Sequence, residues 1–328
     1  MRKHADVVKN IEGFVKENLD LLKEVSEGWQ PSDILPDMTA EGWRDAIQQL
    51  RDQARGVPDE VLVVLVGNAV TEEALPSYQT MINRHPGVAD ETGASDSPWA
   101  RWSRGWTAEE NRHGEVLSRY LYLSGRVDMR AFEIATQHLI RNGFDPKTGN
   151  DPYYGLIYAS FQERATKISH GNTALLANQH GDAILGKICA LVTGDESRHE
   201  EAYKRFVGRI LEVDPSEGVI AFAQMMENTV TMPAHRMADG ETTDLYDQFA
   251  AVAQRIGVYT IHDYADIIEH LVDYWKVAGL SGLAGEAAKA QDYLGSLAQR
   301  YRRLADRAKQ KLSEQPKRSF RWIFNRSI

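Results

Sequence analysis

Four long stretches of the chain carry apolar residues at every third or fourth position, which is the spacing of an amphipathic helix. These stretches cover residues 59–84, 99–124, 153–178 and 181–211. At about 1.5 Å per residue each helix would be roughly 40 Å long, a length that suits a bundle of four antiparallel helices with a shared core. Shorter periodic stretches predict further helices at 5–26, 128–141 and 244–312. Strand signals are scarce, so the pattern predicts an all-α fold.

Clusters of Pro, Gly and Ser separate the periodic stretches and predict loops. They lie at residues 29–37, 85–98, 143–152 and 214–218. None resembles a long flexible linker, so we predict one domain over residues 1–328, with its core bundle at about 59–212. A basic tail at about 300–328 ends the chain. Its last apolar residues are expected to dock on the rest of the protein; they are Phe320, Trp322, Ile323 and Phe324.

Composition and charge exclude several classes of protein. The 328 residues are 42% hydrophobic and 26% charged, which supports a buried core rather than intrinsic disorder. The longest aliphatic run, 61–66, is far shorter than the roughly 20 residues of a membrane-spanning helix. The single cysteine, Cys189, excludes an internal disulfide and a cysteine-rich metal site.

Charge is distributed unevenly along the chain. Residues 300–328 contain ten basic and two acidic residues, a net charge of +8, which leaves −17 on the first 299. This balance disfavours general binding to nucleic acids. The basic tail is either a solvated segment or a contact for an acidic partner protein.

The N-terminal residues lack the apolar core of a secretory signal. Asp6, Glu12 and Glu17 also argue against an organelle transit peptide, which is poor in acidic residues. We therefore expect a cytoplasmic protein of a bacterium. A processed chain in the plastid stroma is the alternative.

Two histidines have a glutamate three residues earlier, in Glu110-Asn-Arg-His113 and Glu196-Ser-Arg-His199. Residues three apart share one face of a helix, so each pair could bind one ion. A surface row of salt bridges is the alternative for either motif alone. Both motifs, however, lie in long predicted helices.

Each motif helix is preceded by another long helix with a glutamate inside an apolar stretch, Glu72 in the first case and Glu163 in the second. The chain thus repeats one half-site twice, in the order Glu and then Glu-x-x-His. This order matches the carboxylate di-metal bundles, in which all these side chains point into the core. Imidazole and carboxylate ligands without a thiolate suit iron or manganese, and we favour two iron ions because dioxygen chemistry needs a redox metal.

Three further residues are expected close to this site. Glu109 and Asp195 directly precede the two motifs and could accept the second N–H of the ligand histidines. Thr166 lies one turn after Glu163, so its hydroxyl either reaches the site or bonds back to the helix carbonyl four residues earlier. Seven further histidines are interpreted as structural or surface residues: His85, His138, His170, His180, His235, His262 and His270.

Over nearly its whole length the sequence resembles the soluble acyl-acyl-carrier-protein desaturases, the stearoyl Δ9-desaturase family. The segments that carry the resemblance are TEEALPSYQTMIN, DETGAS, WTAEENRHGEVLSRYLYLSGRVDMR, SFQERATKISHGNTA, DESRHEEAY, MPAHRM, AVAQRIGVYT, DYADI and the final WIF. The resemblance implies a ferritin-like di-iron carboxylate bundle with additional helices. It places the metal ligands on the same six residues that the spacing selects, namely Glu72, Glu110, His113, Glu163, Glu196 and His199.

The resemblance also implies partners and further roles. Thr166 corresponds to the family's threonine beside the oxygen site, and Trp29 with Asp195 corresponds to an electron path from the surface toward His113. Members are homodimers, take electrons from reduced ferredoxin, and act on an acyl chain held by acyl carrier protein. The residues at substrate-channel positions are Met81, Arg84, His85, Pro146, Thr148, Gly155 and Leu156.

The implied reaction is the O2-dependent introduction of a cis double bond, at Δ9, into a saturated acyl chain during fatty acid biosynthesis. Arg84, His85 and Leu156 differ from the residues typical of stearoyl enzymes, so chain length and bond position stay open. The polar groups of Arg84 and His85 either shorten the pocket or turn outward. The alternative functions are a ferritin-like iron-binding or ferroxidase protein, an acyl-carrier-protein hydroxylase or oxidase with the same cluster, and a non-catalytic helical scaffold.

Overall fold

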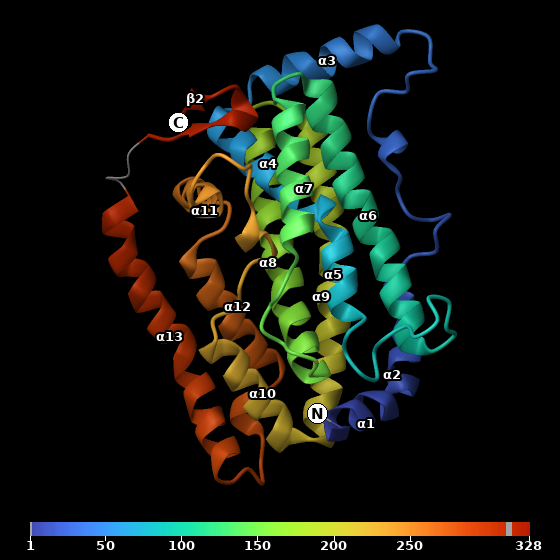
Figure 1. The fold of residues 1–328 in the computed structure, drawn as a ribbon, viewed down its shortest axis with the longest axis vertical. Coiled ribbons are helices and arrows are strands. Elements are labelled where there is room, and N and C mark those ends of the chain that lie inside the picture. Colours follow the sequence, from blue (N-terminus) through green and yellow to red (C-terminus); the bar gives the residue numbers. More distant parts are fainter. Residues whose placement is uncertain (1, 313–316) are drawn as a thin grey trace.

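The computed structural model describes residues 2–312 and 317–328, and it consists almost entirely of helices (Figure 1). Four long helices form at the four predicted stretches. They are α4 (Asp59–Glu73), α6 (Pro98–Ser124), α8 (Pro152–Gln179) and α9 (Ala183–Val213). The prediction of an all-α bundle is therefore confirmed. The span of these helices supports our proposal of a core bundle at about 59–212.

The first predicted helix, 59–84, is divided in the structure. α4 ends at Glu73, and α5 (Leu75–Ile82) begins after Ala74. Pro76 explains the break, because proline has no N–H to continue the backbone ladder and is favoured in the first turn of a new helix.

α4 is the central element of the bundle. Every residue from Val61 to Val70 is buried, which is expected for a helix that is apolar on all sides. It packs against α6, α7 (Met129–Asn142), α8 and α11 (Leu245–Arg255). α8 and α9 lie side by side along most of their length. Among the described residues, no helix is both long and apolar enough to cross a bilayer.

Further helices surround this core. They are α1 (Arg2–Asn10), α2 (Glu12–Glu17), α3 (Trp43–Arg55), α10 (Pro215–Glu227), α12 (Ile261–Tyr274) and α13 (Glu286–Leu312). Short 3-10 helices lie at Leu19–Leu21, Pro31–Asp33, Pro233–Arg236, Val277–Gly279 and Arg321–Ile323. The predicted helices at 5–26 and 244–312 are thus each divided into shorter ones. The predicted loop at 214–218 is wrong, because Pro215 is the first residue of α10, a position where proline is favoured.

The chain ends in a small antiparallel hairpin of β1 (Ser319–Phe320) and β2 (Arg326–Ser327). Phe320, Trp322 and Ile323 are buried, so their expected docking is confirmed. The expectation is wrong for Phe324, which is 54% exposed because it lies at the turn with a positive φ of 57°. Residues 313–316 of the predicted tail lie outside the described residues.

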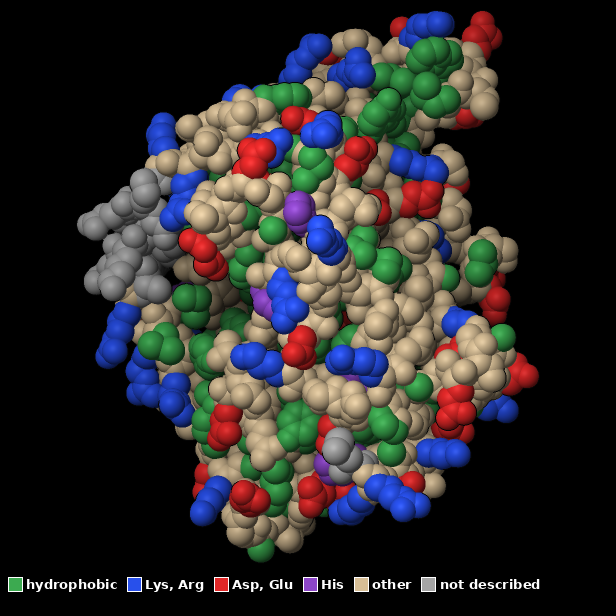
Figure 2. Space-filling view, in the orientation of Figure 1, with side chains coloured by type: hydrophobic (Ala, Val, Ile, Leu, Met, Phe, Trp, Pro, Cys, Tyr) green, Lys and Arg blue, Asp and Glu red, His purple; other side chains and the backbone are tan. Residues whose placement is uncertain are grey.

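A cavity of about 740 Å³ opens beside the bundle. Its walls come from the end of α4, α8, α11, residues 259–264 at the beginning of α12, the later part of α13, the segment 228–235 and Lys147. Figure 2 shows a hollow left of centre in this face of the molecule. Gly67 of α4 allows this wall to form, because a Cβ at that position would overlap the ring of Phe249 on α11.

We therefore expect Gly67→Ala to push α11 away from α4 and to lower the free energy of unfolding by about 1–3 kcal/mol. Thermal unfolding followed by circular dichroism measures this loss. Gly295→Ala on α13 is the matched control, since no heavy atom lies within 4 Å of its added Cβ, and it should be neutral or slightly stabilising. Equal stability of the two variants would contradict the close packing of Phe249 on α4.

Candidate metal centre

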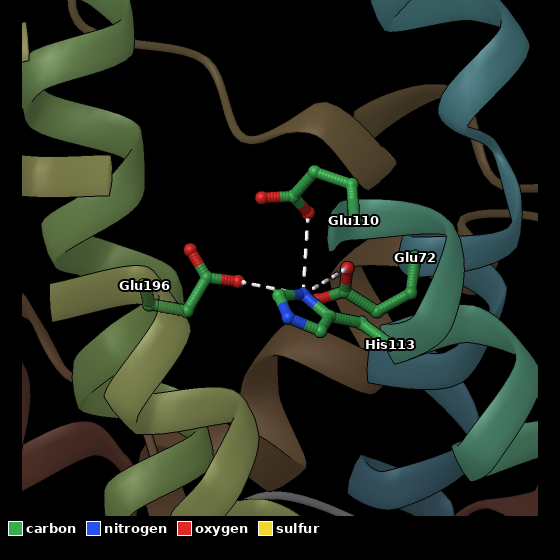
Figure 3. A group of neighbouring side chains, drawn as sticks. All are labelled: Glu72, Glu110, His113 and Glu196. Carbon is green, nitrogen blue, oxygen red and sulfur yellow. Dashed lines mark ion pairs between the residues drawn. The ribbon is translucent and has the colours of Figure 1, made fainter. Parts of the chain in front are cut away.

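The six residues predicted as metal ligands lie together in the core, and each comes from one of the four long helices. One group consists of Glu72, Glu110, His113 and Glu196, which Figure 3 shows converging on the His113 ring. The other consists of Glu110, Glu163, Glu196 and His199. Within each group, one ligand atom of every residue lies within 4.8 Å of the others. Glu110 and Glu196 belong to both groups, so these two carboxylates lie between two potential ion positions.

Both histidines turn their Nδ1 atoms toward the carboxylates. Nδ1 of His113 lies 3.3 Å from Glu110 Oε2 and 3.4 Å from Glu196 Oε1. Nδ1 of His199 lies 2.8 Å from Glu110 Oε1 and 3.6 Å from Glu163 Oε2. These histidine side chains are fully buried. Because each Glu-x-x-His pair spans one turn, both of its side chains point to the same centre.

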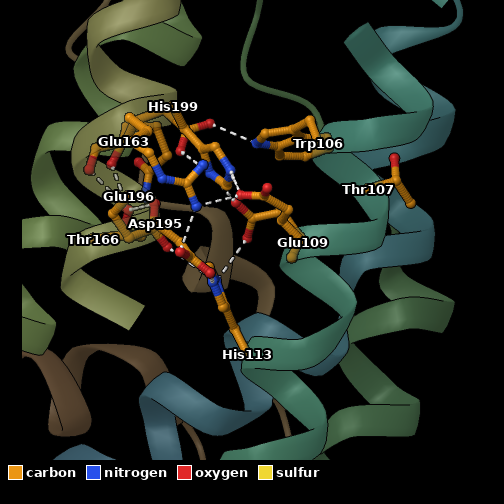
Figure 4. Close-up of polar contacts among 12 residues, drawn as sticks. Trp106, Thr107, Glu109, His113, Glu163, Thr166, Asp195, Glu196 and His199 are labelled. Atoms are coloured by element: carbon orange, nitrogen blue, oxygen red, sulfur yellow. Dashed lines mark hydrogen bonds and ion pairs between the residues drawn. The ribbon is translucent and has the colours of Figure 1, made fainter. Parts of the chain in front are cut away.

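The opposite nitrogens of the histidines are held by acidic residues in a crossed arrangement (Figure 4). Nε2 of His113 on α6 lies 3.4 Å from Asp195 Oδ2 on α9. Nε2 of His199 on α9 lies 3.0 Å from Glu109 Oε2 on α6. The structure thus places both acids where they fix the orientation of a ligand histidine.

The arginines of the two motifs bind these outer acids and not the glutamates that face the centre. Arg198 lies 2.7 Å from Glu109 and 2.5 Å from Asp195, and Arg112 lies 3.2 Å from Asp195. Salt bridges therefore exist, as the alternative interpretation of the motifs expected. They leave Glu110 and Glu196 free of arginine partners among the described residues.

Burial and hydrogen bonding move the pKa values in different directions. Burial raises the pKa of Glu163 well above its ordinary value, and burial also raises that of Glu72. Burial acts in the same direction on Glu109, but hydrogen bonds from His199 and Arg198 outweigh it and lower its pKa to about 2. Burial would lower the pKa of His199, yet the surrounding carboxylates raise it well above 6.5. Protons thus compensate part of the charge of the cluster, and a bound metal ion would displace them.

One residue beside the cluster was interpreted from sequence as structural or surface. His170 is buried, and its Nε2 lies 2.8 Å from Oε1 of Glu72. Trp106 makes the corresponding contact with the glutamate of the other ligand group: its Nε1 donates to Oε1 of Glu163 over 3.0 Å. A signal was available, because His170 follows Glu163 by seven residues and lies two turns along the same face of α8.

Thr166 shows both of the contacts that the sequence left open. Its Oγ1 lies 2.9 Å from Oε2 of Glu196, and it also lies 3.2 Å from the carbonyl of Gln162, four residues earlier. The same residue lines the large cavity. Its hydroxyl therefore lies at the border between the cavity and the carboxylate cluster.

Trp29 connects the surface to the cluster. Its half-buried indole donates from Nε1 to Asp195 Oδ2 over 3.0 Å. Its ring is stacked on His113, with the ring centroids 6.2 Å apart and the planes at 9°. The guanidinium of Arg112 lies 5.1 Å from the same ring. The structure thus brings Trp29, Asp195 and His113 into one chain of contacts.

The predicted channel residues are only partly together. A small cavity of about 20 Å³ is lined by Met81, His85, Gly155 and Leu156, and it shares no lining residue with the large cavity. Pro146 and Thr148 are buried but do not line either cavity, and Arg84 is exposed. His85 is 3% exposed, and its Nε2 lies 3.2 Å from Oγ1 of Thr148. Of the two polar residues in question, Arg84 turns outward and His85 turns inward.

Comparison with known proteins adds to this geometry. A family model described as fatty acid desaturase matches residues 3–324. The chain is 56% identical over 324 residues to the chloroplastic acyl-[acyl-carrier-protein] desaturase of Cucumis sativus, covering 98% of this chain and 82% of that one. It is 53% identical to the chloroplastic stearoyl-[acyl-carrier-protein] 9-desaturase of Spinacia oleracea, covering 98% and 81%. These chloroplastic names do not support our expectation of a bacterial cytoplasm.

Among solved structures, the chain is similar to the X-ray structure of DesA2 from Mycobacterium tuberculosis, which is described as an acyl-ACP desaturase. The TM-score is 0.54 at 18% sequence identity, with 84% of this chain and 97% of that chain covered. The two proteins therefore share a fold, a helical bundle with additional helices.

The raised pKa of Glu163 predicts a pH-dependent effect of Glu163→Gln. The folded, metal-free protein keeps the proton of this carboxyl at pH values where the unfolded chain releases it, so the stability of the wild type falls as the pH rises above the ordinary pKa of 4.5. Metal-free Glu163→Gln should therefore melt higher than the wild type at neutral pH, by about 2 °C for each kcal/mol removed, and the gain should vanish toward pH 4.5. Thermal unfolding across this pH range measures it.

Saturating Fe²⁺ should reverse the sign, because the wild type then gains metal binding that the variant partly loses. Glu73→Gln is the matched control. Burial also raises the pKa of Glu73, which belongs to neither ligand group, so the effect of this substitution on stability should be the same with and without iron. An iron-independent effect of Glu163→Gln would argue against its place among the ligands.

Proposed function

We propose that this chain, which belongs to the fatty acid desaturase family, introduces a cis double bond into a saturated acyl chain carried on acyl carrier protein. It is thus an O2-dependent oxidoreductase of fatty acid biosynthesis. The observation that carries the proposal is the pair of buried four-residue groups that share Glu110 and Glu196 beside a large apolar cavity. The names of the relatives that are 53–56% identical support the carrier-bound substrate.

We further propose that the two groups hold two iron ions. Four buried atoms point to this, because none of them makes a hydrogen bond of ordinary geometry in the described part of the chain, although Nδ1 of His199 and Oε1 of Glu110 lie 2.8 Å apart. The other two atoms are Nδ1 of His113 and Oε1 of Glu196. Lone pairs of nitrogen and carboxylate oxygen without a thiolate are the donors that iron accepts. When bound, the ions supply the activation of dioxygen and the oxidising power that removes hydrogen from an unactivated carbon.

The protein's own residues position this chemistry. Asp195 and Glu109 accept the outer N–H of the two histidines and so keep both Nδ1 lone pairs turned inward. Thr166, which lines the large cavity, donates its hydroxyl proton to Oε2 of Glu196. Methylenes along a saturated chain differ little in reactivity, so the depth to which the chain enters must select the carbon, at Δ9 in our proposal.

The mouth of the cavity supports docking of the acidic carrier protein. Tyr301 and Leu304 of α13 line the cavity, so the basic beginning of the tail borders its opening. Lys147 lines it as well, and Figure 2 shows basic side chains around the hollow. The basic beginning of the tail and the mouth of the cavity therefore lie close together. Complementary charge would guide the encounter and orient the carrier.

We also propose reduced ferredoxin as the electron donor and a homodimer as the assembly. The contacts from the half-buried Trp29 through Asp195 to His113 support an entry point for electrons. The homodimer is proposed from the resemblance in sequence.

Product analysis tests the reaction directly. Iron-loaded protein is incubated with acyl-carrier-protein substrates of several lengths, ferredoxin, its reductase, NADPH and oxygen, and the acyl products are identified by mass spectrometry. We expect a cis-monoene from the wild type and none from Glu196→Ala, which lacks a carboxylate of both groups. A hydroxylated acid would favour the hydroxylase alternative. Bound iron without any acyl product would favour a ferroxidase, and the absence of bound iron would contradict the assigned site.

His85 provides a prediction about chain length. A Cβ on Gly155 would lie 2.7 Å from His85 Nε2, so the imidazole fills the small cavity against α8. We expect His85→Ala to raise the preference for an eighteen-carbon over a sixteen-carbon substrate, in kcat/KM, by about tenfold or more, because each methylene is worth about 1–3 kcal/mol in an apolar pocket. Competition between the two acyl-carrier-protein substrates measures this ratio. Arg84→Ala, an exposed neighbour, should leave it unchanged.

A further inference from the structure

Trp106 contacts the ligand centre without lining the large cavity. Its Nε1 donates to Oε1 of Glu163 over 3.0 Å, and neither residue is among those that line the cavity (Figure 4). The indole is 6% exposed and belongs to a large apolar cluster of the core. The proposed reaction gives this easily oxidised ring no role beyond its hydrogen bond to a ligand.

Trp106 is the last of three tryptophans on one face of α6, after Trp99 and Trp102. The three indole N–H groups have different surroundings. Nε1 of Trp99 donates to the carbonyl of Val8 over 3.0 Å, and Nε1 of Trp102 is buried without a partner among the described residues. Within this row, Trp106 is therefore the tryptophan that donates to a carboxylate.

The carboxylate determines which ring can hold positive charge. Tryptophan is oxidised easily, because loss of one electron from its π-system leaves a delocalised radical cation. Burying such a cation in an apolar cluster is costly unless an anion pairs with it. Glu163 is an anion once metal ions displace its proton, and it lies in hydrogen-bond contact with Trp106. Trp102 lacks such a partner, so the charge is stabilised on Trp106 and not farther along α6.

Trp29, a second tryptophan at the centre, has the opposite surroundings. The guanidinium of Arg112 lies 5.1 Å from its ring. Asp195, which accepts from its Nε1, also binds Arg112 and Arg198, so two guanidinium groups offset the charge of this acid. A cation over an aromatic ring disfavours a second positive charge on that ring. Trp29 is thus suited to pass electrons inward without being left oxidised.

We propose that Trp106 donates one electron to the metal centre when dioxygen has reacted there and no acyl chain lies in the cavity. This inference rests on the proposed function. The electron leaves the indole π-system, the proton stays on Nε1 in its hydrogen bond to Glu163, and no bond forms or breaks. Reduced ferredoxin, the proposed iron–sulfur donor, later returns the electron to the indole. Trp106 thus protects the ligand histidines and the cavity wall from oxidation.

Rapid mixing of the Fe²⁺-loaded full-length protein with O2, without an acyl substrate, tests the inference. Optical absorption and electron paramagnetic resonance of quenched samples should show a tryptophan radical, and ring-deuterated tryptophan should change its hyperfine pattern. Trp106→Phe should lose the radical, and saturating acyl-carrier-protein substrate should suppress it in the wild type. Trp322→Phe is the matched control, because this buried tryptophan lies in the C-terminal hairpin, and it should leave the radical unchanged.

Two further variants separate electron donation from a structural role. Trp106→Tyr keeps an easily oxidised ring, whereas Trp106→His keeps a ring N–H for Glu163 but resists oxidation. We expect a tyrosyl radical from the first variant and no radical from the second, although both should bind iron. After repeated reduction and exposure to O2 without substrate, peptide mass spectrometry should find more oxidised His113 and His199 in Trp106→His than in the wild type.

A radical in Trp106→Phe equal to that of the wild type would overturn the inference. Protection of the ligand histidines by Trp106→His, and not by Trp106→Tyr, would assign Trp106 a structural role only and would also overturn it. Failure of the proposed function gives a different result, because product analysis of the wild type then yields no alkene. An alkene from the wild type without a tryptophan radical in the substrate-free reaction would refute this inference alone.

Discussion

Burying four carboxylates and two imidazoles at one point in a helical core is the constraint on which most of this structure depends. An isolated buried charge costs many kcal/mol unless other charges, protons or ions compensate it. The crossed pairs of His113 with Asp195 and of His199 with Glu109 are part of that compensation, and so are Arg112 and Arg198. The centre thus consists of an inner ring of groups that face one another and an outer ring that holds them in place.

The two halves of the centre are similar but not equal. Glu72 and Glu163 each belong to only one of the two ligand groups, and each has one carboxylate oxygen in a hydrogen bond with a residue outside the groups. The partner of Glu72 is the imidazole of His170, and the partner of Glu163 is the indole of Trp106. The indole is a neutral donor inside an apolar cluster, whereas His170 also lines the large cavity. Glu72 and its partner His170 are therefore in direct contact with the large cavity, whereas Glu163 and Trp106 are not among its lining residues.

Sequence reasoning succeeded where the information is local. A Glu-x-x-His pair spans one helical turn, so its geometry follows from helix periodicity alone, and the order of the half-sites then predicts the bundle. It did not reveal the contact of His170 with Glu72, because these residues are 98 apart in the chain. It also failed at Pro215, where a turn signal marked the beginning of a helix. The large cavity could not be predicted, because seven separate segments of the described chain line it.

All six residues of the centre lie between positions 72 and 199, whereas one side of the cavity consists of residues 228–304. The ligand centre and this side of the cavity are thus encoded in consecutive parts of the sequence, while α4 and α8 contribute to both. Substitutions in the later part can alter which molecule enters without moving any residue of the centre. Such an arrangement is modular, and it allows selection to diversify the products of one enzyme type while its reactive core stays the same.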